Sequence, residues 1–422
     1  MLVANSYLGV LDAPMSYQMT PTTESGARLA AAAERLIPAL RERAGQADRD
    51  GVVCAENFRD LIDSGVASAF VPEELGGFGL ESIHDWTLAI ATLGRGDGST
   101  AIAINMHLAV CRGLALAYRS TTPGSPGADA LAAQLSMIAG GDMLICATAT
   151  ERGTDNLHPL TEATRTDQGW RIDGTKLFVT MSPVATHLAM NLRMQDDDGD
   201  HIATTMLPID TPGVLAQDDW DALGMRASGS QSMRFEDVRL PASAVRKLGP
   251  WGRWSIPVLM NRTLANLPLV GAFLGIAELA CETAIDGVNR QRRLGQPVNE
   301  KSGIQHTVGE MEIELAKCRS ILQQAATGLD QFLEHHREQP PSTEAAHEIM
   351  KDYQAAKWVV NRGAIEIVSK AMDLFGGAGF MNSNLLARLY RDVRAGPFMQ
   401  PYSPTEAREY VGKVALGLLP EH

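Results

Sequence analysis

Aromatic residues are scarce in this sequence, where Phe, Trp and Tyr together make up 5% of 422 residues. Few rings are therefore available to stack on the bases of nucleic acids. Basic residues are also outnumbered: 37 Lys and Arg stand against 50 Asp and Glu, which gives a formal net charge of −13. Proteins that bind the phosphate backbone carry a basic face instead. We therefore expect no nucleic-acid partner.

Cysteine is also rare and follows no recognisable pattern. The five cysteines are scattered, odd in number and without the CxxC spacing of a zinc site, so they indicate neither a zinc site nor a disulfide framework. No uninterrupted apolar run approaches the roughly 18 residues of a membrane helix. The first residues, MLVANSYLGVLDAPMS, lack the basic start and apolar core of a signal peptide. These features predict a cytoplasmic protein with no membrane partner.

The common signatures of hydrolases and metalloenzymes are missing as well. The sequence contains no GxSxG, no HExxH, no P-loop and no GxGxxG after a strand-like run. Its ten histidines are dispersed, and His335 and His336 lie in FLEHHREQ, a charged stretch typical of a solvated helix face. We therefore expect no metal centre.

What is present is an ordered change of texture along the chain. Residues 23–138 repeat apolar side chains every three or four positions, which predicts amphipathic and buried helices. Short β-branched runs separated by turn signals follow, and this pattern predicts antiparallel strands. The helical period then returns in four long segments. This order favours an α+β fold with a helical domain at 1–140, a β domain at 141–250 and a four-helix bundle at 251–422.

Four segments, taken in order, carry a resemblance to a known family. They are FVPEELGGFGL, ATATERGTD with DGTKLFVT, LGMRASGSQSMRFEDVRLP, and DLFGGAGFMNSNLLARLYRDVR. Together they resemble the acyl-CoA dehydrogenase superfamily of flavoproteins, and the resemblance covers nearly the whole chain. It implies an acyl-CoA dehydrogenase-like fold, a flavin cofactor (FAD or FMN) and a homotetramer in which neighbouring subunits complete the cofactor site.

The resemblance assigns the flavin ring to two strand ends. Thr148 and Thr150 match residues near the pyrimidine edge of the isoalloxazine. Thr180 matches the threonine beside flavin N5, and Phe178 takes the place of a ring-stacking tryptophan. A flat aromatic cofactor needs an apolar platform and a few placed hydrogen-bond donors, and these residue types supply both. Thr and Phe are also simply good strand residues.

Two further groups are implied for the rest of the cofactor. Gly376, Gly377 and Gly379 would let the backbone approach the ADP moiety, although glycines also end helices. A family arginine before Phe-Gly pairs with the pyrophosphate. The matching register here falls on a glutamine. Any of the nearby Arg290, Arg292 and Arg293 could therefore bind the pyrophosphate. Alternatively, the three arginines form a solvated basic patch.

The catalytic carboxylate of the family is absent from both places where it is expected. Acyl-CoA dehydrogenases use a carboxylate to remove a proton from carbon. The usual position aligns with Ser403 and the alternative position with Asn261, and neither side chain is a competent base for a carbon acid. Glu406 lies close to the first position in sequence and stays open as a displaced base.

The C-terminal sequence from Gly376 onward is similar to one branch of the superfamily, the two-component flavin N-monooxygenases called amino-sugar nitrososynthases. Such enzymes receive reduced flavin from a separate reductase and use O2 to oxidise an amine, so they need no carbon base. The resemblance implies N-hydroxylation of a small-molecule substrate in antibiotic biosynthesis. It places Thr180 and Ser403 at the reacting centre and assigns the substrate side to Arg394, Phe398 and Gln400.

The leading hypothesis is a flavin-dependent monooxygenase that uses reduced flavin and O2 to oxidise the nitrogen of a nucleotide-linked amino sugar. One alternative is an acyl-CoA dehydrogenase with a displaced base such as Glu406. Another alternative is a catalytically silent scaffold of the same fold, which the retained glycines and Thr180 disfavour.

Overall fold

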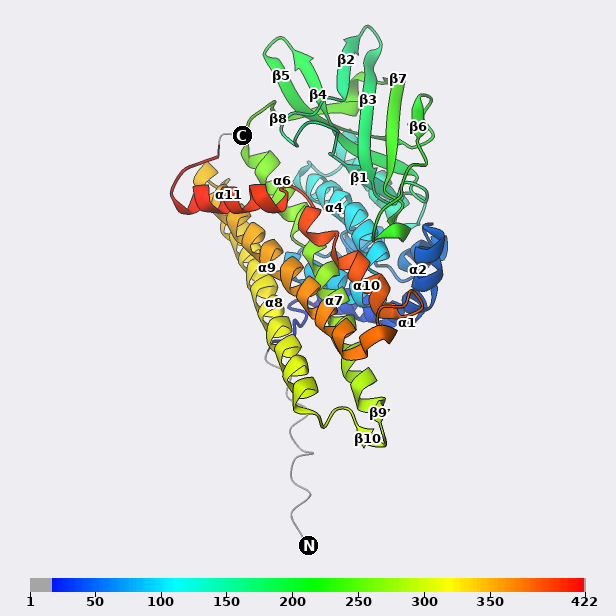
Figure 1. Cartoon of the computed structure of the whole chain (residues 1–422). Coiled ribbons are helices and arrows are strands. Elements are labelled where there is room, and N and C mark those ends of the chain that lie inside the picture. The colour runs from blue at the N-terminus through cyan, green and yellow to red at the C-terminus, as the bar shows by residue number, and fades with distance from the viewer. Residues whose placement is uncertain (1–16, 421–422) are drawn as a thin grey trace.

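The computed structural model describes residues 17–420 and consists of a β domain seated on two sets of helices (Figure 1). Residues 1–16, on which the argument against a signal peptide rests, lie outside the described residues, as do residues 421–422. The chain passes through helices, then strands, then helices again. The expected α+β class is therefore confirmed.

The N-terminal helices are α1 Glu24–Asp50, α2 Ala55–Asp63, α3 Ile83–Gly96, α4 Gly98–Ser120 and α5 Pro126–Ala139. Local signals set their ends. The Thr23 hydroxyl accepts the Gly26 N–H at the start of α1, and Gly51, with a φ of +66°, ends that helix. Asp97 separates α3 from α4 and caps α4 by accepting the Thr100 N–H.

Among the described residues, eight strands form one sheet in the order β6-β7-β3-β2-β4-β5-β8, with β1 paired to β4. Most neighbours are antiparallel, as predicted, but β1 and β2 each pair with β4 in parallel. Parallel neighbours need a connection longer than a hairpin turn, and intervening strands supply it here. The bounds are β1 Ile145–Thr148, β2 Glu162–Thr166, β3 Gly169–Val179, β4 His187–Asp196, β5 Gly199–Pro208, β6 Val214–Ala216, β7 Gln231–Leu240 and β8 Val245–Pro250.

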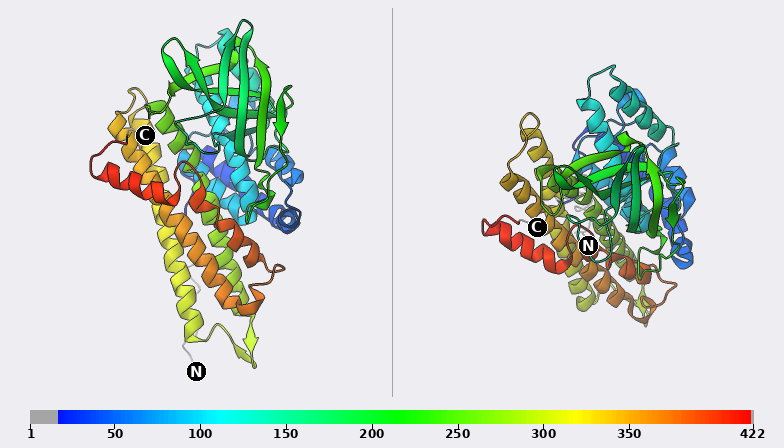
Figure 2. Two further views of the ribbon diagram at one scale, coloured as in Figure 1. Left: turned by 45° about the horizontal axis from the view of Figure 1, so that its top comes forward. Right: turned by 90° about the horizontal axis from the view of Figure 1, so that it is seen from above.

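The C-terminal region departs from the four expected long segments in two places. The first segment breaks at Pro268, which lacks the N–H that a continuous helix needs. The last segment forms two short α-helices, and α7, α8 and α9 are the long ones that lie side by side (Figure 2). The bounds are α6 Ile256–Asn266, α7 Leu269–Arg290, β9 Arg292–Arg293, β10 Gln296–Pro297, α8 Ser302–His335, α9 Thr343–Phe375, α10 Leu385–Val393 and α11 Pro404–Ala415.

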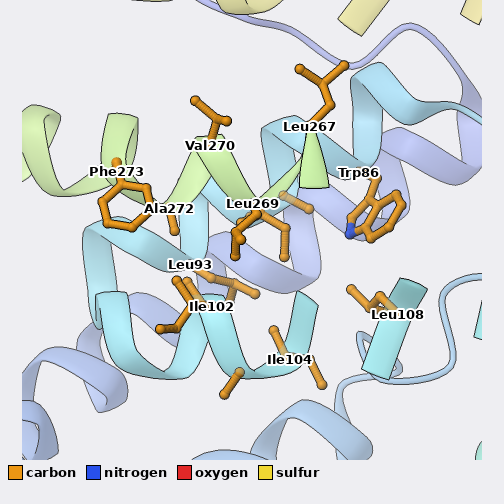
Figure 3. Packing of buried hydrophobic residues seen from close by; sticks show 14 of the residues in the cluster. Trp86, Leu93, Ile102, Ile104, Leu108, Leu267, Leu269, Val270, Ala272 and Phe273 are labelled. Carbon is orange, nitrogen blue, oxygen red and sulfur yellow. The ribbon is translucent and has the colours of Figure 1, made fainter. Parts of the chain in front are cut away.

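Buried apolar side chains from α3, α4 and α7 join the two helical regions into one core (Figure 3). Trp86 of α3 and Phe273 of α7 are among the largest buried side chains. α7 approaches α3 closely, since a Cβ at Gly275 would lie 2.0 Å from the Ala91 carbonyl oxygen. Only a residue without a side chain permits that approach.

Two helical stretches are long and apolar enough to cross a membrane, which corrects the expectation drawn from uninterrupted runs. They are Gly98–Ser120 and Ile256–Arg290, with mean hydropathies of 1.4 and 1.7 over their most apolar windows. Arg112 in the first stretch and Arg262 in the second interrupt the apolar residues, so neither stretch is an unbroken apolar run. The buried shares of the two windows are 56% and 78%, and core helices share this length and composition.

Candidate functional site

The ends of β1 and β3 meet where the β domain rests on α4. The Ile145 N–H donates to Nδ1 of His107 on α4 at 3.0 Å. The Thr148 hydroxyl donates to the Leu177 carbonyl at 2.7 Å, and the Leu177 N–H donates to the Thr150 carbonyl at 2.9 Å. The structure therefore brings Thr148 and Thr150 beside the residue that precedes Phe178.

Phe178 presents an apolar face to the outside of this junction. The pairing of β3 with β7 is irregular between Lys176 and Val179, so Phe178 lies in a bulge. Its φ is +53° and its side chain is 53% exposed. Positive φ is an outlier for a bulky residue, and such strain concentrates at functional sites. An exposed ring held in this way is suited to stacking on a flat ligand.

A chain of hydroxyl groups begins two residues after Phe178, where the Thr180 hydroxyl lies 3.4 Å from the Phe178 carbonyl oxygen. The Thr180 and Ser230 hydroxyls are 2.9 Å apart, and the Ser230 and Ser228 hydroxyls are 2.8 Å apart. Thr180 was predicted from sequence, whereas the two serines were not, although they belong to the quoted LGMRASGSQS motif. The junction thus combines an apolar platform with donors and acceptors, which is the combination that a flavin ring requires.

Residues 399–402 from the C-terminal region close against the same junction. The Gln400 side chain donates to the Thr150 hydroxyl. The Tyr353 hydroxyl donates to the Gln400 carbonyl at 2.8 Å, and the Lys357 ammonium donates to the carbonyls of Met399 and Tyr402. Burial lowers the pKa of Lys357 to about 7. Sequence reasoning missed this lysine, whose signal is a charged residue among the inward-facing positions of α9.

The two positions for a carbon base hold no available carboxylate. Ser403 is the N-cap of α11, and its hydroxyl accepts an N–H from the first turn. Glu406 completes this capping box, because its carboxylate accepts the Ser403 N–H at 2.8 Å. Asn261 on α6 is exposed. The carboxylate of Glu406 is thus engaged at the end of its own helix.

A cleft of about 220 Å³ opens beside Tyr402, between the β1–β2 connection and α11. Its aromatic rings pack on one another: the centroids of Trp254 and Tyr402 are 6.3 Å apart, and those of Tyr402 and Tyr410 are 4.9 Å apart. Three acidic side chains and one lysine also line it, namely Asp155, Glu406, Glu409 and Lys413, and the lysine pairs with Glu409 at 2.8 Å. Pro401 and Tyr402, which follow Gln400 in the chain, line this cleft as well.

A buried ion pair joins Lys176 to Glu151, which follows Thr150 in the chain. The Glu151 carboxylate accepts the Thr161 N–H at 3.1 Å and pairs with the Lys176 ammonium. Burial lowers the pKa of Lys176 to about 8, against the opposing effect of Glu151. Arg262 on α6 is near enough to lower the pKa of Lys176 further. Within residues 17–420, neither Nε nor Nη2 of Arg262 has a hydrogen-bond partner.

The remaining predicted cofactor residues lie at the far end of the C-terminal helices, away from the β domain (Figure 1). The α9 axis from Tyr353, which contacts Gln400, to Phe375 spans about 33 Å at 1.5 Å per residue. The predicted glycines follow Phe375, and a Cβ on either of the first two would meet open space. The structure therefore separates Gly376, Gly377 and Gly379 from Phe178.

The predicted arginines share this distal end. Arg290 is the last residue of α7, and its side chain pairs with Asp286 at 2.9 Å. In the single chain this exposed ion pair favours the alternative that Arg290 is a solvated surface residue. Arg292 and Arg293 are exposed on β9. Leu294, which follows them in the chain, is 98% exposed, and Phe380, which follows the predicted glycines, is 80% exposed. Such apolar exposure is typical of a surface that a partner covers.

The predicted substrate-side residues follow α10. Arg394 is the C-cap of α10 and is half-buried. Its side chain has no hydrogen bond or ion pair to the part of the chain that the structure describes. Phe398 is 67% exposed, and Gln400 contacts Thr150 as described above. Of the three, Gln400 is the residue that the structure brings to the junction directly.

Three family models match successive parts of the chain. They are the acyl-CoA dehydrogenase N-terminal domain at residues 24–121, middle domain at 145–238 and C-terminal domain at 259–400. The strand ends described above fall in the middle domain, and residues 399–400 fall at the end of the C-terminal one.

Two similar proteins with assigned activities match almost the whole chain. The amino sugar nitrososynthase DnmZ of Streptomyces peucetius is 34% identical over 94% of this chain and 95% of its own length. The L-evernosamine nitrososynthase of Micromonospora sp. is 33% identical over 94% of this chain and 92% of its own length.

A solved structure of KijD3 is similar along almost its entire length. It matches with a TM-score of 0.87 and 31% identity over 96% of each chain. That structure contains FMN and dTDP-3-amino-2,3,6-trideoxy-4-keto-3-methyl-D-glucose.

Proposed function

We propose that this chain, which belongs to the acyl-CoA dehydrogenase family, is a flavin-dependent monooxygenase that oxidises the amine nitrogen of a nucleotide-linked amino sugar. One observation carries the proposal: the family's carbon base is replaced by Ser403, which caps α11, and by the exposed Asn261. An amine brings its own lone pair to the reaction, so its oxidation needs no such base.

The residues at the junction fit a flavin. The exposed Phe178 ring offers a stacking face, and the hydroxyls of Thr148, Thr150 and Thr180 lie on the adjoining strand ends. When bound in reduced form, a flavin supplies the two electrons that let one atom of O2 reach the amine while the other leaves as water. The junction residues would hold only the isoalloxazine ring, which FAD and FMN share, so either cofactor fits them.

The chain's own residues exclude water and hold the two reactants. Gln400 ties residues 399–402 to Thr150, and Lys357 fixes the carbonyls on both sides of that contact. This closes one wall of the site. We assign the Thr180 hydroxyl, with Ser230 behind it, to hydrogen bonding at the reacting edge of the ring. Ser403 is assigned to supporting that wall as a helix cap, rather than to proton transfer.

The half-buried Arg394 is our candidate for the diphosphate of the substrate. Its guanidinium has no partner among residues 17–420, and arginine binds phosphate oxygens in a forked geometry. The cleft beside Tyr402 carries three acidic side chains and one lysine, so the diphosphate is expected on the α10 side instead. Phe398 would pack on the sugar or base.

We further propose a homotetramer in the cytoplasm that receives flavin from a separate reductase. The exposed Leu294 and Phe380 support contact with a second copy. In such an assembly the glycines after Phe375 and the β9 arginines would serve the flavin of a neighbouring subunit. All five cysteines are free, which agrees with a reducing compartment.

The test is turnover with supplied reduced flavin. The protein is mixed anaerobically with reduced FMN or FAD and a thymidine-diphosphate 3-amino sugar, and O2 is then admitted. We expect the sugar to gain oxygen by mass spectrometry, with O2 use in excess of peroxide release. Thr180→Val should slow oxygen transfer at least tenfold, whereas Thr175→Val, at an exposed position of β3, should not. Oxidation of flavin with all O2 recovered as peroxide would exclude the proposal.

The competing function is acyl-CoA dehydrogenation with Glu406 as a displaced base, because Glu406 lines the cleft. It predicts that an acyl-CoA reduces bound flavin without O2 and that Glu406→Gln abolishes this reduction. Our proposal predicts no reduction by any acyl-CoA.

A further inference from the structure

We propose that Trp220 and Phe178 form an aromatic corner that receives the dimethylbenzene ring of the flavin. Trp220 is thereby a binding residue for the cofactor that was not predicted from sequence. The inference rests on the proposed function for the identity of the ligand, and it concerns which end of the flavin ring lies where.

The two rings meet at a right angle. Their centroids are 6.1 Å apart and the planes cross at 85°, which is the edge-to-face geometry that aromatic pairs favour. Phe178 remains 53% exposed in this arrangement, so the contact with Trp220 leaves an open face. A ring lying on that face would be bounded at its side by the indole.

Hydrogen bonds fix the indole on its loop. Nε1 of Trp220 donates to the Met225 carbonyl at 3.3 Å and to the Arg226 carbonyl at 3.1 Å. The Trp220 N–H donates to the Gln231 side chain at 3.0 Å. A side chain restrained at both the backbone and the ring loses little further entropy when a ligand packs on it.

The loop itself is tied to two helices. The Met225 N–H donates to the buried Asp392 carboxylate at 2.7 Å, and Nε of Arg226 donates to the Asp48 carbonyl at 2.9 Å. Trp220 therefore does not swing freely over the β domain. These ties hold one wall of the corner in place before any ligand arrives.

The chemistry of the surroundings sets the direction of the ring. A flavin has a polar pyrimidine end and an apolar dimethylbenzene end. The hydroxyls of Thr148 and Thr150 lie at the end of β1, whereas the Phe178–Trp220 pair offers aromatic surface. Matching polar with polar and apolar with apolar places the two methyl groups against the corner.

The residue type at position 178 explains why a second aromatic side chain is needed in this corner. The family resemblance places a tryptophan where this chain has Phe178, so the stacking residue here is smaller. A second aromatic residue from the loop before β7 restores the lost apolar area. Trp220 is thus expected to matter more in this chain than a residue on that loop would matter beside a stacking tryptophan.

The test compares FMN with an analogue that lacks the 7- and 8-methyl groups. Burial of two methyl groups predicts that wild-type protein binds FMN about tenfold more tightly than the analogue, by equilibrium dialysis in oxidised and reduced form. Trp220→Ala and Trp220→Gln should bring this ratio close to one. Trp220→Phe, which keeps a ring, should retain most of it.

The matched control is Trp170→Phe, at the other end of β3, where the indole is buried and donates to the Ala242 carbonyl at 3.1 Å. Its ratio should equal that of wild type. A ratio that survives in Trp220→Ala overturns the inference while flavin binding itself still stands. Failure of wild-type protein to bind either flavin in either redox state would instead count against the proposed function.

Discussion

Replacing Arg262 with methionine should make the ligand-free protein more stable. Burial lowers the pKa of Arg262 from 12.5 to about 10, and desolvation is the cause, with no acidic residue acting against it. Since a tenfold change in proton affinity is worth about 1.4 kcal/mol, holding this charge inside the fold costs about 3 kcal/mol. Methionine keeps the apolar length of the side chain and removes the charge.

Loss of some packing reduces the expected gain to about 2 kcal/mol in the free energy of unfolding. The assay is urea unfolding followed by circular dichroism at pH 7, without flavin or nucleotide. The matched control is Arg388→Met. Both arginines are 7% exposed, but Arg388 pairs with Asp97 at 3.3 Å. Breaking that pair leaves buried carboxylate unpaired and should cost about 3 to 5 kcal/mol.

The two variants should therefore shift the unfolding midpoint in opposite directions. A loss of stability in Arg262→Met comparable with that in Arg388→Met would refute the reasoning, because it would mean that the guanidinium of Arg262 is well compensated in the folded chain. Arg262→Lys separates charge from shape: it keeps the buried charge and should show no gain.

Three other predictions follow from single contacts. Gly275→Ala should destabilise the protein by about 3 kcal/mol, since its Cβ would overlap the Ala91 carbonyl, whereas Gly309→Ala on α8 meets no atom and should be neutral or stabilising by about 1 kcal/mol in the same urea titration. Lys357 has a pKa of about 7 in the folded protein and 10.5 in the unfolded chain, so the free energy of unfolding should decrease as the pH falls from 10.5 to 7. Lys357→Met should reduce this pH dependence, and an unchanged pH dependence would contradict the lowered pKa of Lys357. Glu406→Gln should lower stability by about 1 kcal/mol through the α11 cap and leave amine oxidation intact; loss of oxidation would restore Glu406 as a catalytic candidate.

The sequence predicts the order of helices and strands because each element carries its own periodicity. The sequence also predicts that Thr148, Thr150 and Phe178 lie together, because they belong to two family motifs whose strand ends are expected at the flavin ring. It does not predict that Gln400 donates to Thr150, because that hydrogen bond joins residues 250 positions apart and depends on how two domains dock. The break at Pro268 was visible in the sequence but was outweighed by the apolar period on both sides.

Trp220 and Arg262 were missed for a different reason. Trp220 belongs to no periodic pattern, and Arg262 lies in a helical segment in which one arginine is unremarkable. Each gains meaning only from its surroundings: an edge-on ring in one case, and the lack of a counter-charge among the described residues in the other. Burial without a partner is a property of three-dimensional packing, so no spacing rule reveals it.

The span of α9 between the flavin platform and the glycines after Phe375 has a genetic consequence if the distal glycines serve a neighbour. A substitution at Gly377 would then impair the flavin site of the neighbouring subunit, whereas one at Phe178 would impair the site of the subunit that carries it. Two differently damaged chains, mixed in one assembly, would leave some sites with both parts intact. Mixing two inactive variants would therefore restore activity. The distal surface would be under selection for the active site of a neighbouring subunit.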